Sequence, residues 1–159
     1  MSYKFKFIAV TGGRHFANRD LVFTVLGYEK WMFERDDKYN NIVLIHGDAK
    51  GADALAKEWA DLTKTISLAY PVGINDWDNF GIAAGPIRNK NMLSMFPTVD
   101  KLIWFTGGAG TENCKSYAKS INIPVVSAWD VYAEIENQPI QNKRIPLNYI
   151  PGILLPWED

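Results

Sequence analysis

The chain is poor in the residues that build disulfides and metal sites. Its 159 residues include one cysteine, Cys114, and two histidines, His15 and His46. A single thiol cannot form an internal disulfide, and the Cys/His spacing typical of metal sites is absent. We therefore predict that the protein has no metal ligands and needs no cofactor.

Excess charge and long apolar runs are also missing. Lys and Arg total 17 against 18 for Asp and Glu, so no basic excess favours nucleic acid as a partner. No apolar run is long enough to cross a bilayer, and "MSYKFKFIAV" enters a strand-like run without a signal-peptide cleavage pattern. We therefore expect a cytoplasmic protein with no membrane partner.

Strand-like and helical patterns alternate along most of the chain. Hydrophobic residues make up 47 %, enough for the core of a single domain. Helical spacing covers Arg19–Glu34 behind Asn18 as N-cap, and recurs from Ala52, from Pro86 after a long loop, and after "TGGAGT". The apolar strand-like runs are residues 5–10, 41–45, 65–70, 100–105 and 123–128. This order predicts an α/β fold, an open parallel sheet of about five strands with helices on both faces.

The composition changes after Ala128, so we predict a domain over residues 1–128 and a separate segment over 129–159. "WDVYAEIEN" is typical of a short helix, and the proline-spaced apolar stretch behind it cannot form a regular helix. Such a tail lies extended either on the body of its own chain or on a partner subunit, which would make a homodimer.

Four unusual segments each follow a predicted strand: "TGGRHF", "HGDAKGAD", "GINDWDNFGIAAGPIRN" and "TGGAGTEN". Parallel strands end at one edge of their sheet, and ligands bind in the crevice there. We therefore predict a binding crevice at that edge, formed by Gly12, Gly13, Arg14, Gly47, Asp48, Gly51, Asp53, Trp77, Arg88, Asn89, Gly107, Gly108, Gly110 and Thr111.

The "TGGAGT" segment has the composition of a phosphate-binding loop. Glycines let backbone amides approach an anion, and a helix opened by Thr111 would add its positive end. In the alternative interpretation Thr111 is an N-cap and the glycines only form a turn. The loop lacks the P-loop ending, and "GGRHFA" fails the dinucleotide fingerprint, which disfavours an NAD dehydrogenase. Arg14 and Arg88 offer planar guanidinium groups for phosphate.

The acidic and aromatic candidates each have two interpretations. Asp48 and Asp53 flank a helix start, so each either caps that helix or binds ribose hydroxyls. Trp77 either stacks on a base or packs its own loop. His46 closes a buried strand, and we expect it to be a packed side chain; His15 stays undecided.

The chain resembles the SLOG superfamily, which includes the Lonely Guy (LOG) phosphoribohydrolases and the Rossmann-like domain of DprA. The segments "VTGGRHF", "HGDAKGADALAKEWA", "DWDNFGIAAGPIRNKNML" and "GGAGTENCKSYAKSINIPV" are similar to the blocks of its YspA-like branch, in the same order. The likeness runs from Phe5 to Val126. It implies a Rossmann-like fold that binds a nucleotide or a nucleotide-derived ligand.

The LOG enzymes hydrolyse nucleoside 5′-monophosphates to free base and ribose 5-phosphate. Their motifs are R-K-x-x-M and P-G-G-x-G-T-x-E-E, and their catalytic pair is the Arg with the first of the two Glu residues. Here Arg88 matches that Arg and Asn89 replaces the Lys, whereas Asn113 stands at the catalytic Glu and Glu112 one residue earlier. Asn cannot carry the negative charge that stabilises an oxocarbenium-like sugar.

The resemblance leaves two functions open. The first is hydrolysis of an N-glycosidic bond, with Arg88 and a carboxylate from Glu112, Asp48, Asp78, Asp53 or Asp76. The alternative is a non-catalytic module that senses or sequesters a nucleotide, in which Asn113 belongs to the binding site. Binding of single-stranded DNA, which the likeness to DprA suggests, is disfavoured because such grooves are basic.

Overall fold

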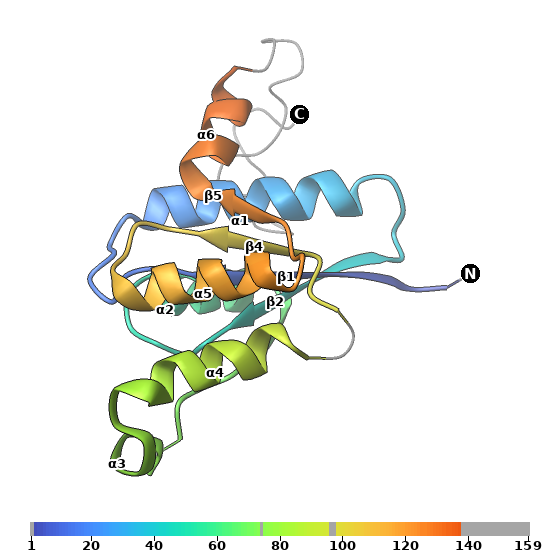
Figure 1. Ribbon diagram of the computed structural model, residues 1–159. Coiled ribbons are helices and arrows are strands. Elements are labelled where there is room, and N and C mark those ends of the chain that lie inside the picture. The colour runs from blue at the N-terminus through green and yellow to red at the C-terminus, as the bar shows by residue number, and fades with distance from the viewer. Residues whose placement is uncertain (1, 74, 96–97, 138–159) are drawn as a thin grey trace.

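The computed structural model describes residues 2–73, 75–95 and 98–137. Strands and helices alternate along the chain (Figure 1). In chain order the elements are β1 (Lys4–Thr11), α1 (Arg19–Glu34), β2 (Asn40–His46), α2 (Ala52–Leu62), β3 (Ile66–Ala69), α3 (Asp76–Phe80), η1 (Gly81–Ala83), α4 (Ala84–Leu93), β4 (Lys101–Trp104), α5 (Ala109–Ser120), β5 (Val125–Ser127) and α6 (Ala128–Glu136).

The strands form one parallel sheet in the order β3-β2-β1-β4-β5. Strand β1 is central and pairs in parallel with β2 and β4, with Ile8 opposite both Leu44 and Lys101. Strands β3 and β5 are the two outer strands. The predicted α/β fold, a Rossmann-like open parallel sheet with helices on both faces, is confirmed.

Two apolar cores hold the helices on opposite faces of the sheet. Ile8 and Val10 of β1 point into the core under α1, α2 and α6, which contains the fully buried Trp59. Ala9 points the other way, toward α4 and α5, and lies in a cluster with Met92. Because successive strand residues point to opposite faces, one apolar strand supplies both cores.

Asn18 caps α1 as the sequence predicts, since its Oδ1 accepts a hydrogen bond from the Leu21 amide at 3.0 Å.

Three helix boundaries differ from the prediction. The region predicted as a loop before Pro86 contains α3 and η1, and α4 already begins at Ala84. Pro86 still lies in the first turn of α4, where the amide it lacks has no partner within the helix. Helix α5 begins at Ala109, before Thr111, with Gly108 as its N-cap.

The segment after β5 begins with the predicted short helix. Helix α6 buries Ala128, Val131 and Ile135 in the core it shares with α1, and the Ser127 hydroxyl caps it by accepting from the Trp129 amide at 3.2 Å. The extended tail that the sequence predicts, residues 138–159, lies outside the described residues, so the division at residue 128 and the homodimer stay predictions.

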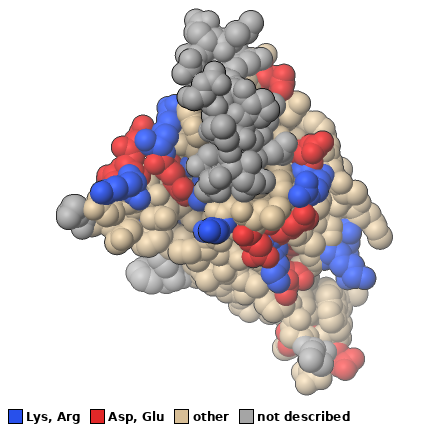
Figure 2. All heavy atoms as spheres, turned by 180° about the vertical axis from the view of Figure 1, so that it is seen from behind, with Lys and Arg blue, Asp and Glu red and all other residues tan. Residues whose placement is uncertain are grey.

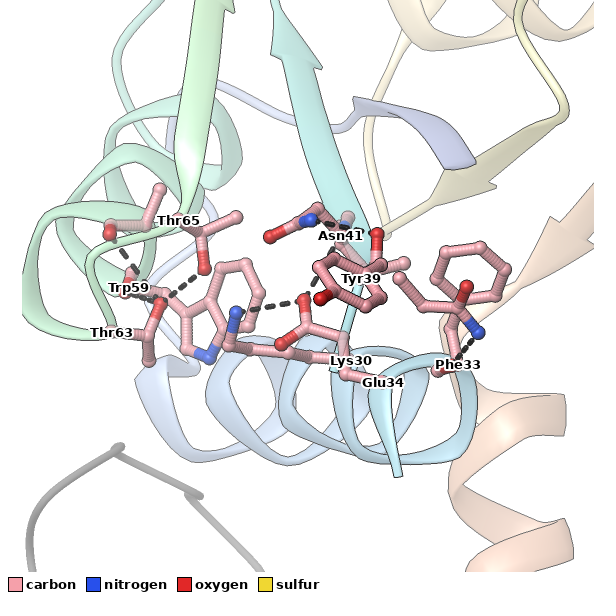
Figure 3. Close-up of polar contacts among 11 residues, drawn as sticks. Lys30, Phe33, Glu34, Tyr39, Asn41, Trp59, Thr63 and Thr65 are labelled. Carbon is pink, nitrogen blue, oxygen red and sulfur yellow. Dashed lines mark hydrogen bonds and ion pairs between the residues drawn. The ribbon is translucent and has the colours of Figure 1, made fainter. Parts of the chain in front are cut away.

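Polar side chains tie the end of α1 to the start of β2, at the edge of the sheet where the strands begin (Figure 3). The Glu34 carboxylate accepts hydrogen bonds from Lys30 Nζ at 2.9 Å and from the Ile42 amide at 3.0 Å. Asn40 Nδ2 donates to the Phe33 carbonyl at 3.0 Å. These bonds join the C-terminal end of α1 to the first residues of β2.

Surface charge is mixed on the face drawn in Figure 2. Basic and acidic side chains are interspersed there, and no continuous basic area crosses the described residues of that face. Among residues 2–73, 75–95 and 98–137, none of the helices has the length and apolar character needed to span a membrane.

Candidate functional site

A pocket of about 980 Å³ lies at the edge where the strands end, called the carboxyl edge below. Its wall comes from the loops after β1, β2, β3 and β4, together with parts of α2, α3, α4, α5 and α6. Thirteen of the predicted ligand residues line it: Gly12, Gly13, Arg14, Gly47, Asp48, Asp53, Trp77, Arg88, Asn89, Gly107, Gly108, Gly110 and Thr111. Gly51, Asp78, Glu112 and Asn113 do not belong to the lining.

Glycines let the three loops touch one another directly. Gly51 has a φ of +78°, and a Cβ there would lie 2.1 Å from the Gly13 carbonyl oxygen. That oxygen accepts a hydrogen bond from the Ala52 amide at 3.2 Å, while the Gly13 amide donates to the Thr106 carbonyl at 2.9 Å. Gly51 thus shapes the pocket from behind, without belonging to its lining.

The "GGAGT" loop, residues 107–111, has one packed end and one open end. A Cβ on Gly107 would lie 2.1 Å from Thr111 Oγ1 and 2.6 Å from the Gly13 nitrogen, so only glycine fits. A Cβ on Gly108 or Gly110 would meet no heavy atom within 4 Å. The side of the loop toward the pocket is therefore open to a ligand.

The start of α5 presents backbone amides to this open side. Its N-cap, Gly108, has no side chain to accept hydrogen bonds from the first turn. Those amides and the helix dipole favour an anion. Thr111 is buried and is the third residue of the helix, so its interpretation as the N-cap is wrong.

Arg88 connects three segments of the pocket. Its Nη1 donates to the carbonyls of Gly47 and, at 3.5 Å, of Tyr70, and its Nε donates to Asn89 Oδ1 at 2.9 Å. Arg14 is exposed on the opposite loop and lines the same pocket. Arg14 and Arg88 therefore both line the pocket that the "GGAGT" loop faces.

Asn89 and Asn113 form an uncharged pair beside Arg88. Asn89 is 4 % exposed, and its Nδ2 donates to Asn113 Oδ1 at 3.1 Å and to the Gly110 carbonyl at 3.3 Å. The position where the LOG enzymes have a catalytic Glu thus holds an amide that is already hydrogen-bonded to a neighbour.

Two of the predicted catalytic carboxylates lie away from the pocket. Glu112 has a side chain that is 65 % exposed and pairs with Lys115 Nζ at 3.0 Å on the surface of α5. Asp78 is exposed on α3. Asp48 lines the pocket, but it is exposed and has a φ of +55°.

Asp53 is the buried carboxylate of the pocket wall, 5 % exposed. Its Oδ2 accepts hydrogen bonds from the amides of Gly47 at 3.1 Å and Ala49 at 3.3 Å, in the loop before α2. Its Oδ1 has no hydrogen-bond partner in the described structure. Burial raises the pKa of Asp53 to about 6, although the Ala49 amide and the Arg88 charge oppose this shift. Asp53 therefore braces a loop and does not cap α2.

His46 is packed, as its position in the sequence predicts. It is 1 % exposed, and its Nδ1 accepts a hydrogen bond from the Asp48 amide at 3.0 Å, which assigns the ring proton to Nε2. Burial lowers its pKa. Burial also raises the pKa of the Cys114 thiol to about 11, which makes it a poor nucleophile. His15 is exposed and lines the pocket.

Sequence reasoning missed Trp129 as a pocket residue. It lies in the first turn of α6, is 48 % exposed and lines the pocket. The rule that located the other loops applies here too, because β5 ends just before it. The described residues contain no group of three or more His, Cys, Asp and Glu side chains that could hold a metal.

Comparison with known proteins supports the resemblance found in the sequence. Residues 7–77 match the model of the YAcAr family, described as the YspA, cpYpsA-related SLOG family. The chain is 28 % identical to the Gene 61 protein of Mycobacterium phage D29 over 125 residues, which are 77 % of this chain and 96 % of that protein. No solved structure gave a significant match.

The family match covers the loops after β1 and β2, with Gly12, Gly47 and Asp53, and ends within α3 at Trp77. The "GGAGT" loop lies beyond it and is assigned to the pocket by its geometry. Over residues 7–77 this chain is therefore similar to the SLOG superfamily, in its YspA-like branch.

Proposed function

We propose that the protein binds a nucleotide or a nucleotide-derived compound in the carboxyl-edge pocket. A phosphate group accepts hydrogen bonds from the amides at the start of α5, and Arg14 and Arg88 supply positive charge. The observation that carries this proposal is the pocket itself, in which the glycine loops after β1, β2 and β4 meet at one open cavity. The similarity of residues 7–77 to the SLOG family, which suggests a nucleotide-related function, supports the same ligand class.

A loop variant and a surface variant test the phosphate site. In Gly107→Ala the new Cβ clashes with Thr111 and Gly13, whereas Glu112→Gln changes an exposed side chain of α5 that does not line the pocket. We expect nucleoside mono- and diphosphates to raise the melting temperature of the wild-type protein and of Glu112→Gln, and Gly107→Ala to bind at least tenfold more weakly. A ligand at one hundred times its Kd adds about 2.7 kcal/mol of stability, which such a scan detects.

The same experiment provides the contradicting outcomes. The proposal fails if no linear or cyclic nucleotide in the panel changes the melting temperature of the wild-type protein. It fails equally if Gly107→Ala keeps its fold, as judged by circular dichroism, and binds phosphate compounds as tightly as the wild-type protein does.

Hydrolysis of an N-glycosidic bond is the second candidate, and Asp53 favours it. An ionised carboxylate near C1′ stabilises positive charge on the sugar and takes a proton from the attacking water, while the electrons of the C1′–N bond leave with the base. Asp53 lines the pocket, has an oxygen without a hydrogen-bond partner and has a pKa raised to about 6.

Release of free base distinguishes catalysis from binding. Hydrolysis requires that the wild-type protein free a base from some nucleoside monophosphate and that Asp53→Asn lower this rate at least a hundredfold while binding persists. Asn is the suitable replacement, because its side-chain oxygen can still accept hydrogen bonds from the Gly47 and Ala49 amides. If nucleotides bind and no base is released between pH 5 and pH 8, the protein is a binding module.

A further inference from the structure

Two exposed tryptophans line the pocket. Trp77 of α3 is 51 % exposed and Trp129 of α6 is 48 % exposed, although both contribute to the pocket wall. Large aromatic side chains dominate the energetics of binding surfaces, and an indole with half its surface exposed in a pocket is available for stacking. Neither ring is needed as filling for the two apolar cores, because neither belongs to them.

Each indole lies beside another residue of the structure, on α4 for Trp77 and on α6 for Trp129. The edge of the Trp77 ring lies near Gly85 at the start of α4, since a Cβ on Gly85 would be 3.9 Å from Trp77 Cη2. Trp129 follows the Ser127 cap of α6, and its ring meets that of Tyr132 edge-on with centroids 6.2 Å apart. Each ring therefore has one neighbour beside it, while about half of its surface stays exposed.

The topology of the sheet places the two indoles at opposite ends of the pocket. Helix α3 follows β3 and helix α6 follows β5, and these are the two outer strands. In Figure 1, α3 and the start of α6 lie on opposite sides of the sheet's carboxyl edge. Five strands at about 4.8 Å spacing span roughly 19 Å. The "GGAGT" loop follows β4, so the phosphate site lies between the two rings.

A single base cannot stack on both indole rings. The pocket volume of about 980 Å³ is at the upper end of the roughly 300–1,000 Å³ typical of small-molecule sites. A nucleoside monophosphate would leave one indole exposed, whereas two bases joined through phosphate would cover both. A long nucleic acid strand fits less well, because a net charge of −1 does not provide the basic groove that tracks a backbone.

We propose that the ligand is a dinucleotide, with one base stacked on Trp77, the other on Trp129, and the linking phosphate at the start of α5. This inference rests on the proposed function and narrows its ligand class. Stacking on an indole tolerates any base, so the two rings select for the number of bases and leave their identity to other contacts.

Calorimetric titration of the full chain with four adenine compounds tests the proposal. The probes are AMP, ADP, diadenosine 5′,5′-diphosphate and adenylyl-3′,5′-adenosine; the last two distinguish a diphosphate from a phosphodiester linkage. We expect at least one two-base compound to bind tenfold or more tightly than AMP. Trp77→Ala and Trp129→Ala should each remove most of this advantage, and the corresponding Phe variants should retain it.

Phe80→Ala is the matched control, because Phe80 is 49 % exposed on the same helix as Trp77 and does not line the pocket. It should leave all four affinities unchanged. The dinucleotide proposal is overturned, and nucleotide binding stands, if AMP binds and neither two-base compound binds more tightly. It is also overturned if only one tryptophan affects the two-base affinity. If none of the four compounds binds, the proposed function loses its support as well.

Discussion

A buried carboxylate lies at each end of the sheet, and the two differ in their hydrogen-bond and charge partners. Glu29, at the end where the strands begin, and Asp53, at the carboxyl edge, are 6 % and 5 % exposed. Both oxygens of Glu29 accept from Lys101 Nζ, at 2.9 and 3.1 Å, and Lys6 lies 3.9 Å away. Asp53 accepts from two neutral amides through one oxygen, and its other oxygen has no partner.

This difference separates the part of the molecule that holds the fold from the part that forms the pocket. At the strand-starting end the buried charges Glu29 and Lys30 each have an opposite charge beside them. The unpartnered atoms there, Asn40 Oδ1 and Trp59 Nε1, belong to neutral groups. At the carboxyl edge a buried charge is left incompletely compensated, which is a common property of binding and catalytic sites.

The largest effect on stability is expected from removing one partner of the buried ion pair between Glu29 and Lys101. Lys101→Met leaves the Glu29 carboxylate buried with only the more distant Lys6, and removing one partner of a buried pair is strongly destabilising. We expect the free energy of unfolding, measured by urea denaturation at pH 7, to fall by roughly 3–4 kcal/mol.

The double variant Glu29→Leu/Lys101→Met is the control for that measurement. It removes both charges, and replacing a buried pair by apolar side chains is often close to neutral. A loss below about 1 kcal/mol in the single variant would show that the pair is effectively solvated, and the contrast between the two ends would disappear.

Asp53→Asn should have the opposite effect at the carboxyl edge, and the effect should depend on pH. The pKa of Asp53 is about 6 in the folded protein against 3.8 in the unfolded chain, so folding favours the protonated acid. Its contribution to stability is full below about pH 4 and is lost as the pH rises through 6. The pKa difference corresponds to roughly 2–3 kcal/mol.

Asn does not titrate, so the stability of Asp53→Asn relative to the wild-type protein should rise by that amount between pH 4 and pH 7. Urea denaturation at several pH values measures this difference. Asp48 and Arg88 also act on the pKa of Asp53, and both are present in the two proteins compared. A stability difference that stays flat over this range would mean that Asp53 is compensated, as Glu29 is.

The smallest effect on stability is expected at Glu112, which is not one of the buried charged residues at either end of the sheet. Its side chain is exposed and pairs with Lys115 on the surface of α5. Glu112→Gln should change the free energy of unfolding by less than about 0.5 kcal/mol, and the nucleotide affinity by less than twofold. A larger loss of affinity or activity would mean that Glu112 belongs to the binding site and that the ligand lies in a different position.

Much of the fold and of the pocket could be predicted from local sequence. Alternating apolar strands and helices predicted the parallel sheet, and the rule that strand ends share one edge placed Gly12, Gly47 and Gly107 together. The prediction failed for α3 and for the start of α5, where glycine and polar residues carry little periodic signal. It also missed Trp129, because the predicted domain ended at Ala128, although β5 ends just before this residue.

The sequence by itself determined the order of elements and the chemistry of the loops, because periodicity and glycine content are local properties of the chain. Only the tertiary structure decided which carboxylate reaches the pocket. Glu112 stands beside the glycines in sequence, yet the turn of α5 directs it to solvent. Asp53 lies far away in sequence, yet the packing of α2 against the sheet buries it in the pocket wall. Burial and unmet hydrogen bonds depend on neighbours from distant segments, and folding alone brings those together.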